Sequence, residues 1–95
     1  MEFLAIARRR TERFSEQEFT ALLEPEAERV RELYAAGTLR AAWSRDDVPG
    51  AVLLLECAGE SDAWAVLATL PLAGRDMLEI QLLPVRGYRG FGPRG

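Results

Sequence analysis

The stretch LRAAWSRDDVPGAVLLLECA, residues 39–58, decides the fold because it holds two strand candidates and the turn between them. Residues 39–45 are the first candidate, and residues 51–58 form a run that is apolar on both faces, as a buried strand is. Between them, DDVPG at 46–50 concentrates residue types that favour a turn. The centre of the chain is therefore predicted to be strand, turn, strand.

The segment before this stretch predicts one strand and one helix. Residues 2–8, EFLAIAR, form a short apolar run without helical period, which indicates a buried strand. A charged turn follows at 9–13. From residue 14 an apolar stripe repeats at helical period until Gly37, which has the position of a C-terminal cap.

The start of this helix carries the best local signal in the chain. Ser15 and Glu18 have the spacing of a capping box, and Phe14 and Phe19 have that of a hydrophobic staple. Pro25 interrupts the helix. It predicts either a kink or a fresh start with the proline near the first turn.

The segment after the central stretch predicts a second helix and a fourth strand. GESD at 59–62 begins the helix, with Ser61 or Asp62 as its N-cap, and Pro71 ends it. The predicted buried stripe is Ala63, Trp64, Val66, Leu67 and Leu70. After a short connector, MLEIQLLPV at 77–85 is the last strand.

The predicted order is β-α-β-β-α-β, a ferredoxin-like α+β fold in which two helices lie on one face of a four-stranded antiparallel sheet. Strands 2–8 and 51–58 are apolar on both faces, whereas a one-sided antiparallel sheet should alternate. We therefore expect a second copy to cover the other face, sheet against sheet, in a dimeric α+β barrel or a higher homo-oligomer. The domain is predicted over residues 1–86, followed by a Gly/Arg-rich arm at 87–95.

The composition excludes several classes of chemistry. Histidine and lysine are absent, and all 12 basic residues are arginines. No imidazole or primary-amine side chain is therefore available for acid–base work, Schiff-base formation or haem and zinc ligation. We expect no cofactor and no metal site.

The same survey predicts a cytoplasmic protein without membrane contact. No run approaches the ~20 apolar residues of a membrane helix. At the N-terminus the apolar residues precede the arginines, the reverse of a signal peptide. The single cysteine, Cys57, is predicted buried and inert, and fits a reducing compartment.

The tail RGYRGFGPRG, residues 86–95, has the Arg-Gly pairs and aromatics of RNA-binding tails. However, residues 1–85 carry a net charge of −6 against +3 in the tail, so the body would repel a polyphosphate. We favour an arm that reaches a partner subunit, anchored by Tyr88 and Phe91, and expect no nucleic-acid partner.

Three stretches carry a family resemblance: W-S-R at 43–45, S-D-x-x-x-x-L-x-x-L-P-L at 61–72, and L-E-I-Q-L-L-P-V at 78–85 running into a short arm. With the strand order, they resemble muconolactone isomerase-like domains of the dimeric α+β barrel group over nearly the whole chain. The resemblance implies a cofactor-free isomerase that moves a proton around a small unsaturated lactone. It also implies a multimer with a pocket inside or between barrels.

By this resemblance the site would contain Trp43 and Arg45 on the second strand, Glu56 on the third and Glu79 on the fourth. The arm after Val85 would close over a neighbouring pocket. The chain departs from the family in lacking every histidine and lysine, so proton transfer would run on carboxylates alone. That lack also excludes relatives that use an Asp-His pair or a histidine-ligated haem.

The residues themselves also point to Glu79 and Glu56, which interrupt apolar strands. The even positions of 77–85 are uniformly apolar and should take the helices, which leaves Glu79 and Gln81 facing the barrel interior or the dimer seam. Burial there would raise the pKa of Glu79 toward that of a general base. Glu56 could instead be solvated at the mouth. The alternative for Glu79 is a structural ion pair with Arg8, Arg40 or Arg45.

The predicted substrate-binding set is Trp43, Arg45, Phe3, Gln81 and Tyr88. Arg45 and Arg40 would hold an anionic ligand, since a planar guanidinium matches a carboxylate, or else form surface salt bridges on an edge strand. Trp43 and Phe3 would line a pocket for a flat molecule, or else belong to the core.

Three functions follow from these observations. The leading one is a homo-oligomeric barrel that binds a small organic molecule and acts as an isomerase through Glu79 and Glu56. The alternative is a non-catalytic oligomerisation or binding module, with a filled seam and Glu79 locked to an arginine. RNA binding through the tail ranks last.

Overall fold

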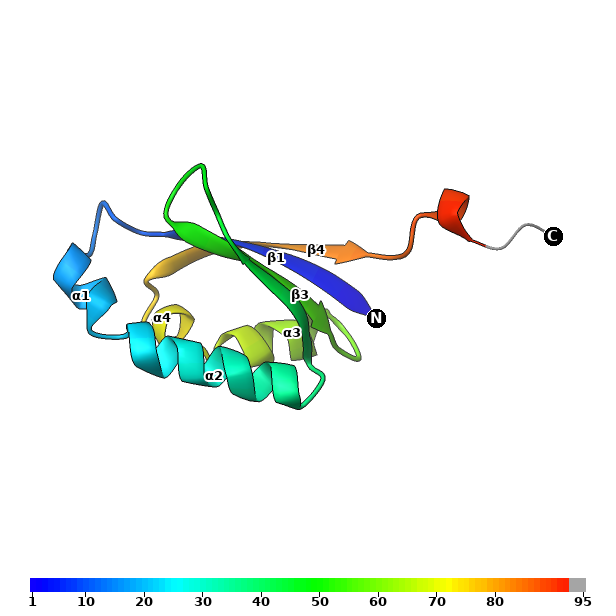
Figure 1. Cartoon of the computed structure of the whole chain (residues 1–95), viewed down its shortest axis with the longest axis horizontal. Helices are drawn as coiled ribbons and strands as arrows, with labels where there is room; N and C mark the ends of the chain where they lie inside the picture. Colours follow the sequence, from blue (N-terminus) through cyan, green and yellow to red (C-terminus); the bar gives the residue numbers. More distant parts are fainter. Residues whose placement is uncertain (93–95) are drawn as a thin grey trace.

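The computed structural model describes residues 1–92 and contains one four-stranded antiparallel sheet with its helices on one side (Figure 1). The elements in order are β1 (Glu2–Arg9), α1 (Glu16–Thr20), α2 (Leu23–Ala35), β2 (Leu39–Ser44), β3 (Gly50–Glu56), α3 (Glu60–Leu67), α4 (Pro71–Gly74), β4 (Leu78–Val85) and the 3-10 turn η1 (Arg89–Phe91). The predicted ferredoxin-like order is confirmed, with each predicted helical segment divided in two.

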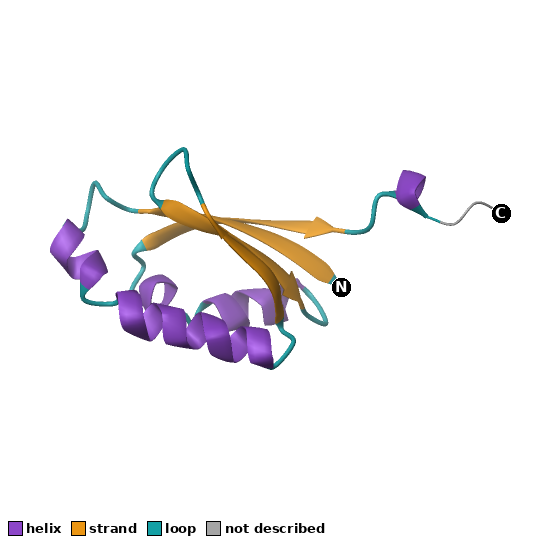
Figure 2. Ribbon diagram, viewed as in Figure 1, coloured by secondary structure: helices purple, strands orange, loops and turns teal. Residues whose placement is uncertain are grey.

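The strands lie in the order β2-β3-β1-β4, so β1 and β3 are central and β2 and β4 form the edges. Ala5 of β1 lies opposite Leu53 of β3 and Leu82 of β4, which places all three on one face. Between Leu39 and Ala41 the register of β2 shifts by a bulge. All four helices lie on the same side of the sheet, and the opposite side is bare (Figure 2).

Two apolar clusters hold the helices to the sheet. The larger one contains the buried residues Phe3, Ala5, Leu33, Leu39, Leu53, Leu55, Ala63, Leu67 and Leu70. The smaller one lies under α1 and contains Phe19, Leu22, Leu72 and Met77. Every buried side chain of β1 and β3 therefore points to the helix side.

The start of the helical region forms as expected. The Ser15 side chain accepts the Glu18 N–H and the Glu18 carboxylate accepts the Ser15 N–H, so the capping box is complete. The rings of Phe14 and Phe19 meet edge to face at 6.2 Å. Pro25 starts a new helix, because α2 begins at Leu23 and the proline occupies its first turn.

The second helical region differs from the prediction at both ends. The N-cap is Gly59 rather than Ser61 or Asp62. Because glycine has no side chain, no side-chain hydrogen bond caps this helix. The helix α3 ends at Leu67, and Pro71 begins α4 instead of terminating α3. The residue before a proline avoids the helical region, so Leu70 is extended and separates the two helices.

Trp64 was expected in the buried stripe but its side chain is 41% exposed. Ala63, Leu67 and Leu70 already occupy the face of α3 and its extension that meets the sheet. Trp64 is one residue, about 100°, around the helix from Ala63. Cys57 is half-buried just beyond β3 rather than within it, and burial raises the pKa of its thiol.

No helix within the described residues is long and apolar enough to cross a membrane.

Candidate functional site

A cavity of about 250 Å³ lies between the helix-covered face of the sheet and the helices α2, α3 and α4. It exists because the helix-facing positions at this end of the sheet are small: Ala5, Ala7, Ala42 and Ala51. Gly50, opposite Arg8 in the register, also lines the cavity and has to be small, since a Cβ there would collide with the Ala7 carbonyl oxygen of the neighbouring strand. The small side chains leave room that the larger residues of the helices do not fill.

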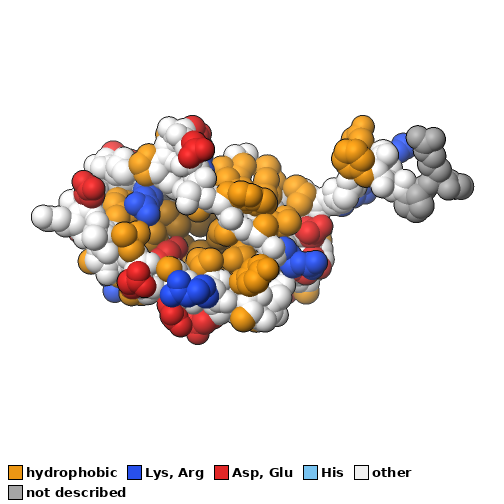
Figure 3. Space-filling model, viewed as in Figure 1, with side chains coloured by type: hydrophobic (Ala, Val, Ile, Leu, Met, Phe, Trp, Pro, Cys, Tyr) orange, Lys and Arg blue, Asp and Glu red, His pale blue; other side chains and the backbone are white. Residues whose placement is uncertain are grey.

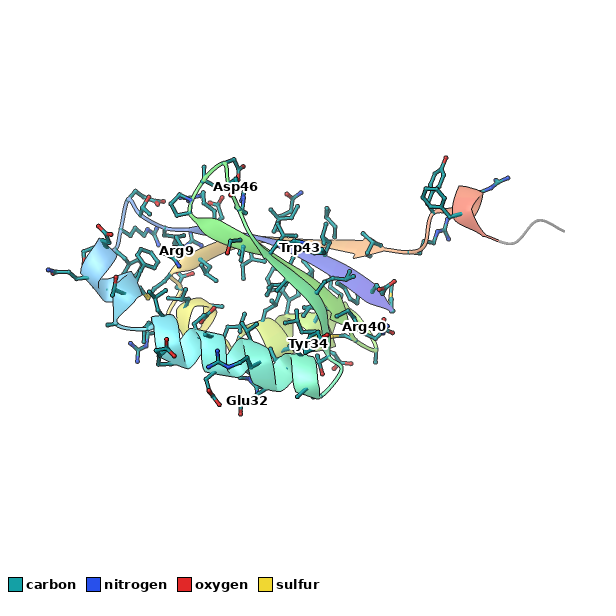
Figure 4. The ribbon with its side chains drawn as sticks, in the orientation of Figure 1. Arg9, Glu32, Tyr34, Arg40, Trp43 and Asp46 are labelled. Atoms are coloured by element: carbon teal, nitrogen blue, oxygen red, sulfur yellow. The ribbon has the colours of Figure 1, made fainter. Side chains whose placement is uncertain are left out.

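The cavity opens at the side of the molecule, between edge strand β2 and helix α2, where Figure 3 shows a hollow lined mainly by apolar atoms. Figure 4 places Arg9 at one end of this opening and Tyr34 and Arg40 at the other, with Trp43 above it on β2. Arg9, Glu26 and Ser44 are the charged and hydroxyl-bearing residues that line the cavity. An otherwise apolar space thus contains one guanidinium and one carboxyl group.

Arg9 ends β1 on the same face as Ala5 and Ala7, which brings its side chain to the cavity. Its backbone N–H donates to the Pro49 carbonyl at 2.9 Å. The guanidinium carbon lies 5.3 Å from the centroid of the Phe19 ring. Within residues 1–92 this half-buried guanidinium forms no salt bridge and donates no side-chain hydrogen bond, so its five N–H groups are available to an anion.

Glu26, in the first turn of α2, supplies the carboxyl group. Its Oε1 accepts the backbone N–H of Leu72 at 2.9 Å, which ties α2 to α4. Burial raises the pKa of Glu26; the Leu72 N–H and the positive charge of Arg9 oppose that rise without cancelling it. A half-buried carboxyl with a raised pKa in a cleft has the properties of a proton-transfer group.

The structure places Glu79 and Gln81 on the bare face of the sheet, away from the cavity. Register puts Glu79 opposite Arg8, and Arg8 Nη2 lies 3.4 Å from Glu79 Oε2. Arg10 Nη1 is 3.9 Å from the same oxygen. The Glu79 side chain is 61% exposed. The structure therefore contains the ion pair with Arg8 that was the alternative to a buried general base.

Glu56 also lies on the bare face, at the other end of β3. Its Oε1 is 2.6 Å from the amino group of Met1. Around it is a second, more open pocket of about 560 Å³ whose other lining residues are Met1, Glu2, Pro84, Val85, Arg86 and Gly87. The structure therefore does not bring Glu56 and Glu79 together, and neither lines the cavity.

The remaining predicted binding residues separate as well. Arg45 is engaged by Asp47 through two hydrogen bonds of 2.9 and 2.7 Å, and this pairing lowers the pKa of Asp47 to about 2. Phe3 is 1% exposed within the core. Trp43 alone of the set borders the cavity, but register pairs it with Val52, so its side chain lies on the bare face of the sheet, where the residue is 53% exposed.

Tyr88 lies on the arm, which projects from the end of β4 away from the body (Figure 1). It is 71% exposed and its ring meets that of Phe91 at 5.3 Å. Residues 93–95 of the predicted arm lie outside the described residues.

Sequence reasoning missed both charged residues of the cavity, although each carried a signal. Arg9 continues the alternation Phe3, Ala5, Ala7 that marks the helix-facing side of the strand. Glu26 lies four residues after Leu22 and four before Val30, within the apolar stripe. In both cases a charged residue occupies a position where the repeat of the strand or helix predicts a buried apolar one, and this was the available indication of a site.

No group of three His, Cys, Asp or Glu side chains in the described part of the chain is placed to hold a metal ion.

Comparison with known proteins gives one family match and a structural likeness. The model of the family described as muconolactone delta-isomerase matches residues 1–89. The structure is similar to that of 5-chloro-2-hydroxyhydroquinone dehydrochlorinase from Burkholderia phenoliruptrix, in complex with 2,5-dihydroxybenzoquinone. The TM-score is 0.78 at 13% identity, over 95% of this chain and 98% of that chain. No curated protein matches the sequence significantly.

Proposed function

The chain belongs to the muconolactone delta-isomerase family, and we propose that it is a cofactor-free isomerase that transfers a proton within a small unsaturated lactone bound in the cavity. The observation that carries the proposal is the pair of Arg9 and Glu26 in one apolar cavity. One is an arginine without an ion-pair partner in the described residues, and the other is a carboxyl whose pKa is raised by burial.

Arg9 would bind the anionic group of the substrate. A guanidinium offers two parallel N–H donors that match a carboxylate, and such charge-assisted hydrogen bonds are stronger in an apolar surrounding. The cavity of about 250 Å³ corresponds to the liquid volume of roughly eight water molecules. A ligand of that size fits with its anionic group at Arg9 and its ring against the alanines.

Glu26 would move the proton. Its ionised carboxylate takes a proton from the sp3 ring carbon next to the conjugated double bond, and the electron pair left behind delocalises through that double bond into the lactone carbonyl as a dienolate. The same carboxyl then returns the proton to a different carbon, which shifts the double bond without any net oxidation. Because the Leu72 N–H holds Oε1, the second oxygen, Oε2, is the one free to exchange the proton.

We place this role on Glu26 rather than on Glu79 or Glu56 because only Glu26 lines the cavity. The other two carboxylates are paired with Arg8 and with the Met1 amine.

Assembly is the second part of the proposal. The bare face of the sheet has an apolar centre with charged residues at its ends; the central side chains are Leu4, Ile6, Val52, Leu54 and Leu83. We propose that a second copy covers this face, sheet against sheet, as in a dimeric α+β barrel. Tyr88 and the arm would then reach a partner subunit.

The test is to incubate the protein with muconolactone and follow the shift of the double bond by proton NMR in D₂O. Wild type is expected to convert the lactone and Arg9→Gln to lose roughly 10- to 100-fold in kcat/KM, the effect of one charge-assisted hydrogen bond or bidentate pair. Binding of 2,5-dihydroxybenzoquinone, measured by calorimetry, probes the same cavity independently. A protein that neither isomerises the lactone nor binds the quinone would contradict the proposal.

A non-catalytic oligomerisation module remains the second candidate, supported by the ion pair between Arg8 and Glu79. It predicts that Arg9→Gln and Glu26→Gln variants assemble normally and that no variant of the cavity changes any measured function.

A further inference from the structure

The side chain that lies against Arg9 is Phe19 of α1. The ring is 3% exposed, and its centroid is 5.3 Å from the guanidinium carbon of Arg9. A guanidinium at this distance is attracted by the ring quadrupole. Phe19 is not a cavity-lining residue, so it contacts the anion-binding group without contacting the space a ligand would occupy.

Phe19 is itself held firmly by its surroundings. The capping box of Ser15 and Glu18 fixes the start of the five-residue helix α1, which would otherwise be too short to be stable alone. The Phe14 ring meets the Phe19 ring edge to face at 6.2 Å. On the other side, Phe19 packs in the cluster with Leu22, Leu72 and Met77.

Arg9 is held by much less. An arginine side chain loses considerable rotamer entropy when it is fixed in one geometry. In residues 1–92 the Arg9 guanidinium has no salt bridge or side-chain hydrogen bond to fix it; it interacts with the charge of Glu26 and lies against the Phe19 ring. The ring is therefore in a position to favour the Arg9 rotamer directed at the cavity before a ligand arrives.

We propose, resting on the function proposed above, that Phe19 is a positioning residue whose ring holds the Arg9 guanidinium ready for the anionic group of the substrate. The expected consequence of removing the ring is a loss of about two- to thirtyfold in affinity for an anion, the range of cation–π interactions. A neutral ligand of the same shape is expected to be unaffected, because it makes no use of the guanidinium charge.

The binding test compares benzoate with benzamide, measured by calorimetry on wild type, Phe19→Leu, Arg9→Gln and Leu22→Ala. Leu22 belongs to the same cluster but does not line the cavity, so its variant controls for general loosening. Wild type and Leu22→Ala are expected to prefer benzoate, and Phe19→Leu and Arg9→Gln to lose that preference. Phe19→Tyr, which keeps the ring, is expected to restore it.

The outcomes separate this proposal from the one on which it rests. If Arg9→Gln loses the preference and Phe19→Leu keeps it, Phe19 is only a core residue and this proposal fails alone. If wild type itself shows no preference, the assignment of Arg9 as the anion site fails.

A measurement without ligand tests the positioning role in either case. The order parameter of the Arg9 Nε–Hε group by NMR should fall in Phe19→Leu, and in Phe19→Met, which keeps an unbranched apolar side chain but no ring, and should not fall in Leu22→Ala. Equal order parameters in all four proteins would overturn the proposal.

Discussion

The two faces of the sheet are built from the same four strands and have opposite chemistry. On the helix-covered face the side chains are apolar and mostly buried, and the charged exceptions, Arg9 and Glu26 of the overlying helix, meet in a cavity. On the bare face the apolar side chains are central and half-exposed. The charges lie at its ends and are largely neutralised by neighbours, as Glu79 is by Arg8 and Glu56 by Met1.

The difference between the two faces shows which surroundings change the proton affinity of a carboxyl group. A charge on an accessible face is solvated and screened, so pairing it adds little beyond local order. A carboxyl in an apolar cavity has its pKa raised by burial, as Glu26 does. A charged residue within a strand is therefore a weak indicator of a site until the covered face is known.

The contrast between the two faces is tested most directly by replacing one carboxyl group with an amide on each face. We expect Glu26→Gln to reduce turnover of the lactone by about 10²- to 10⁴-fold, the usual contribution of a general acid–base group. Glu79→Gln is the matched control on the bare face and should stay within about threefold of wild type, since a surface pair contributes little. Steady-state kinetics of both variants would decide between the faces, and the reverse result would return the role to Glu79.

The apolar centre of the bare face can be tested by a charge. Leu54 lies between Leu4 and Ala41 on this face, and Leu54→Asp should leave the chain folded while abolishing dimers, because burying an unpaired carboxylate costs several kcal/mol. Light scattering with size-exclusion chromatography measures the mass. Val48→Asp, in the exposed turn before β3, is the control and should assemble as wild type does. A Leu54→Asp dimer would show that the sheet face is not the interface.

The arm is expected to have a smaller effect on the same face. Removal of residues 87–95 takes away the Tyr88–Phe91 pair, which is exposed on the isolated chain and would bury apolar area on a partner. We expect the dissociation constant of the dimer to rise several-fold, measured by sedimentation at a series of concentrations, with the fold unchanged. Unaltered assembly and unaltered quinone binding would mean that the arm is only a solvated end.

The smallest effect is a difference in stability with pH. Because the pKa of Glu26 is raised, the folded chain keeps its proton at pH values where the unfolded carboxyl, near 4.5, has lost it. The stability from this group is complete below about pH 4.5 and is lost as pH rises through the folded pKa. The unfolding free energy of Glu26→Gln relative to wild type should therefore increase from pH 4 to pH 8 in urea titrations.

The titration of other carboxyl groups does not change the difference in unfolding free energy between Glu26→Gln and wild type. Salt bridges and hydrogen bonds lower the pKa of Glu12 and of Asp47 to about 2, so their contribution has the opposite sign and disappears in acid, equally in both proteins. A difference that stays constant with pH would show that Glu26 is not shifted.

Much of the fold was predictable because its determinants are local. The capping box at Ser15, the proline at 25 and the alternation of β4 each act over a few residues, and all three form as expected. Trp64 was misplaced because a helical stripe predicts a broad face, whereas the sheet beneath α3 accommodates only Ala63, Leu67 and Leu70. Its exposure is set by packing between elements.

The site was less predictable because it depends on contacts across the fold. Arg9 and Glu26 belong to different elements, β1 and α2, and come to line one cavity only when those elements pack in the fold. The sequence offered Arg8, Arg40 and Arg45 as ion-pair partners for Glu79, and it is the strand register that selects Arg8. The small residues that open the cavity were visible as alanines, but alanine in a strand is equally compatible with tight packing.

Those alanines have an evolutionary consequence. An unfilled space forgoes packing energy, and enlarging a small residue beside it commonly gains about 0.5–2 kcal/mol. Ala7 and Ala51 border the cavity and are open to such replacements, whereas Gly50 is barred from them by the Ala7 carbonyl. Selection for stability alone would favour valine or leucine in place of the two alanines, and these larger side chains would fill the cavity. A laboratory evolution experiment that rewards only thermal resistance should therefore sacrifice the cavity first, and the positions that fill would trace its outline.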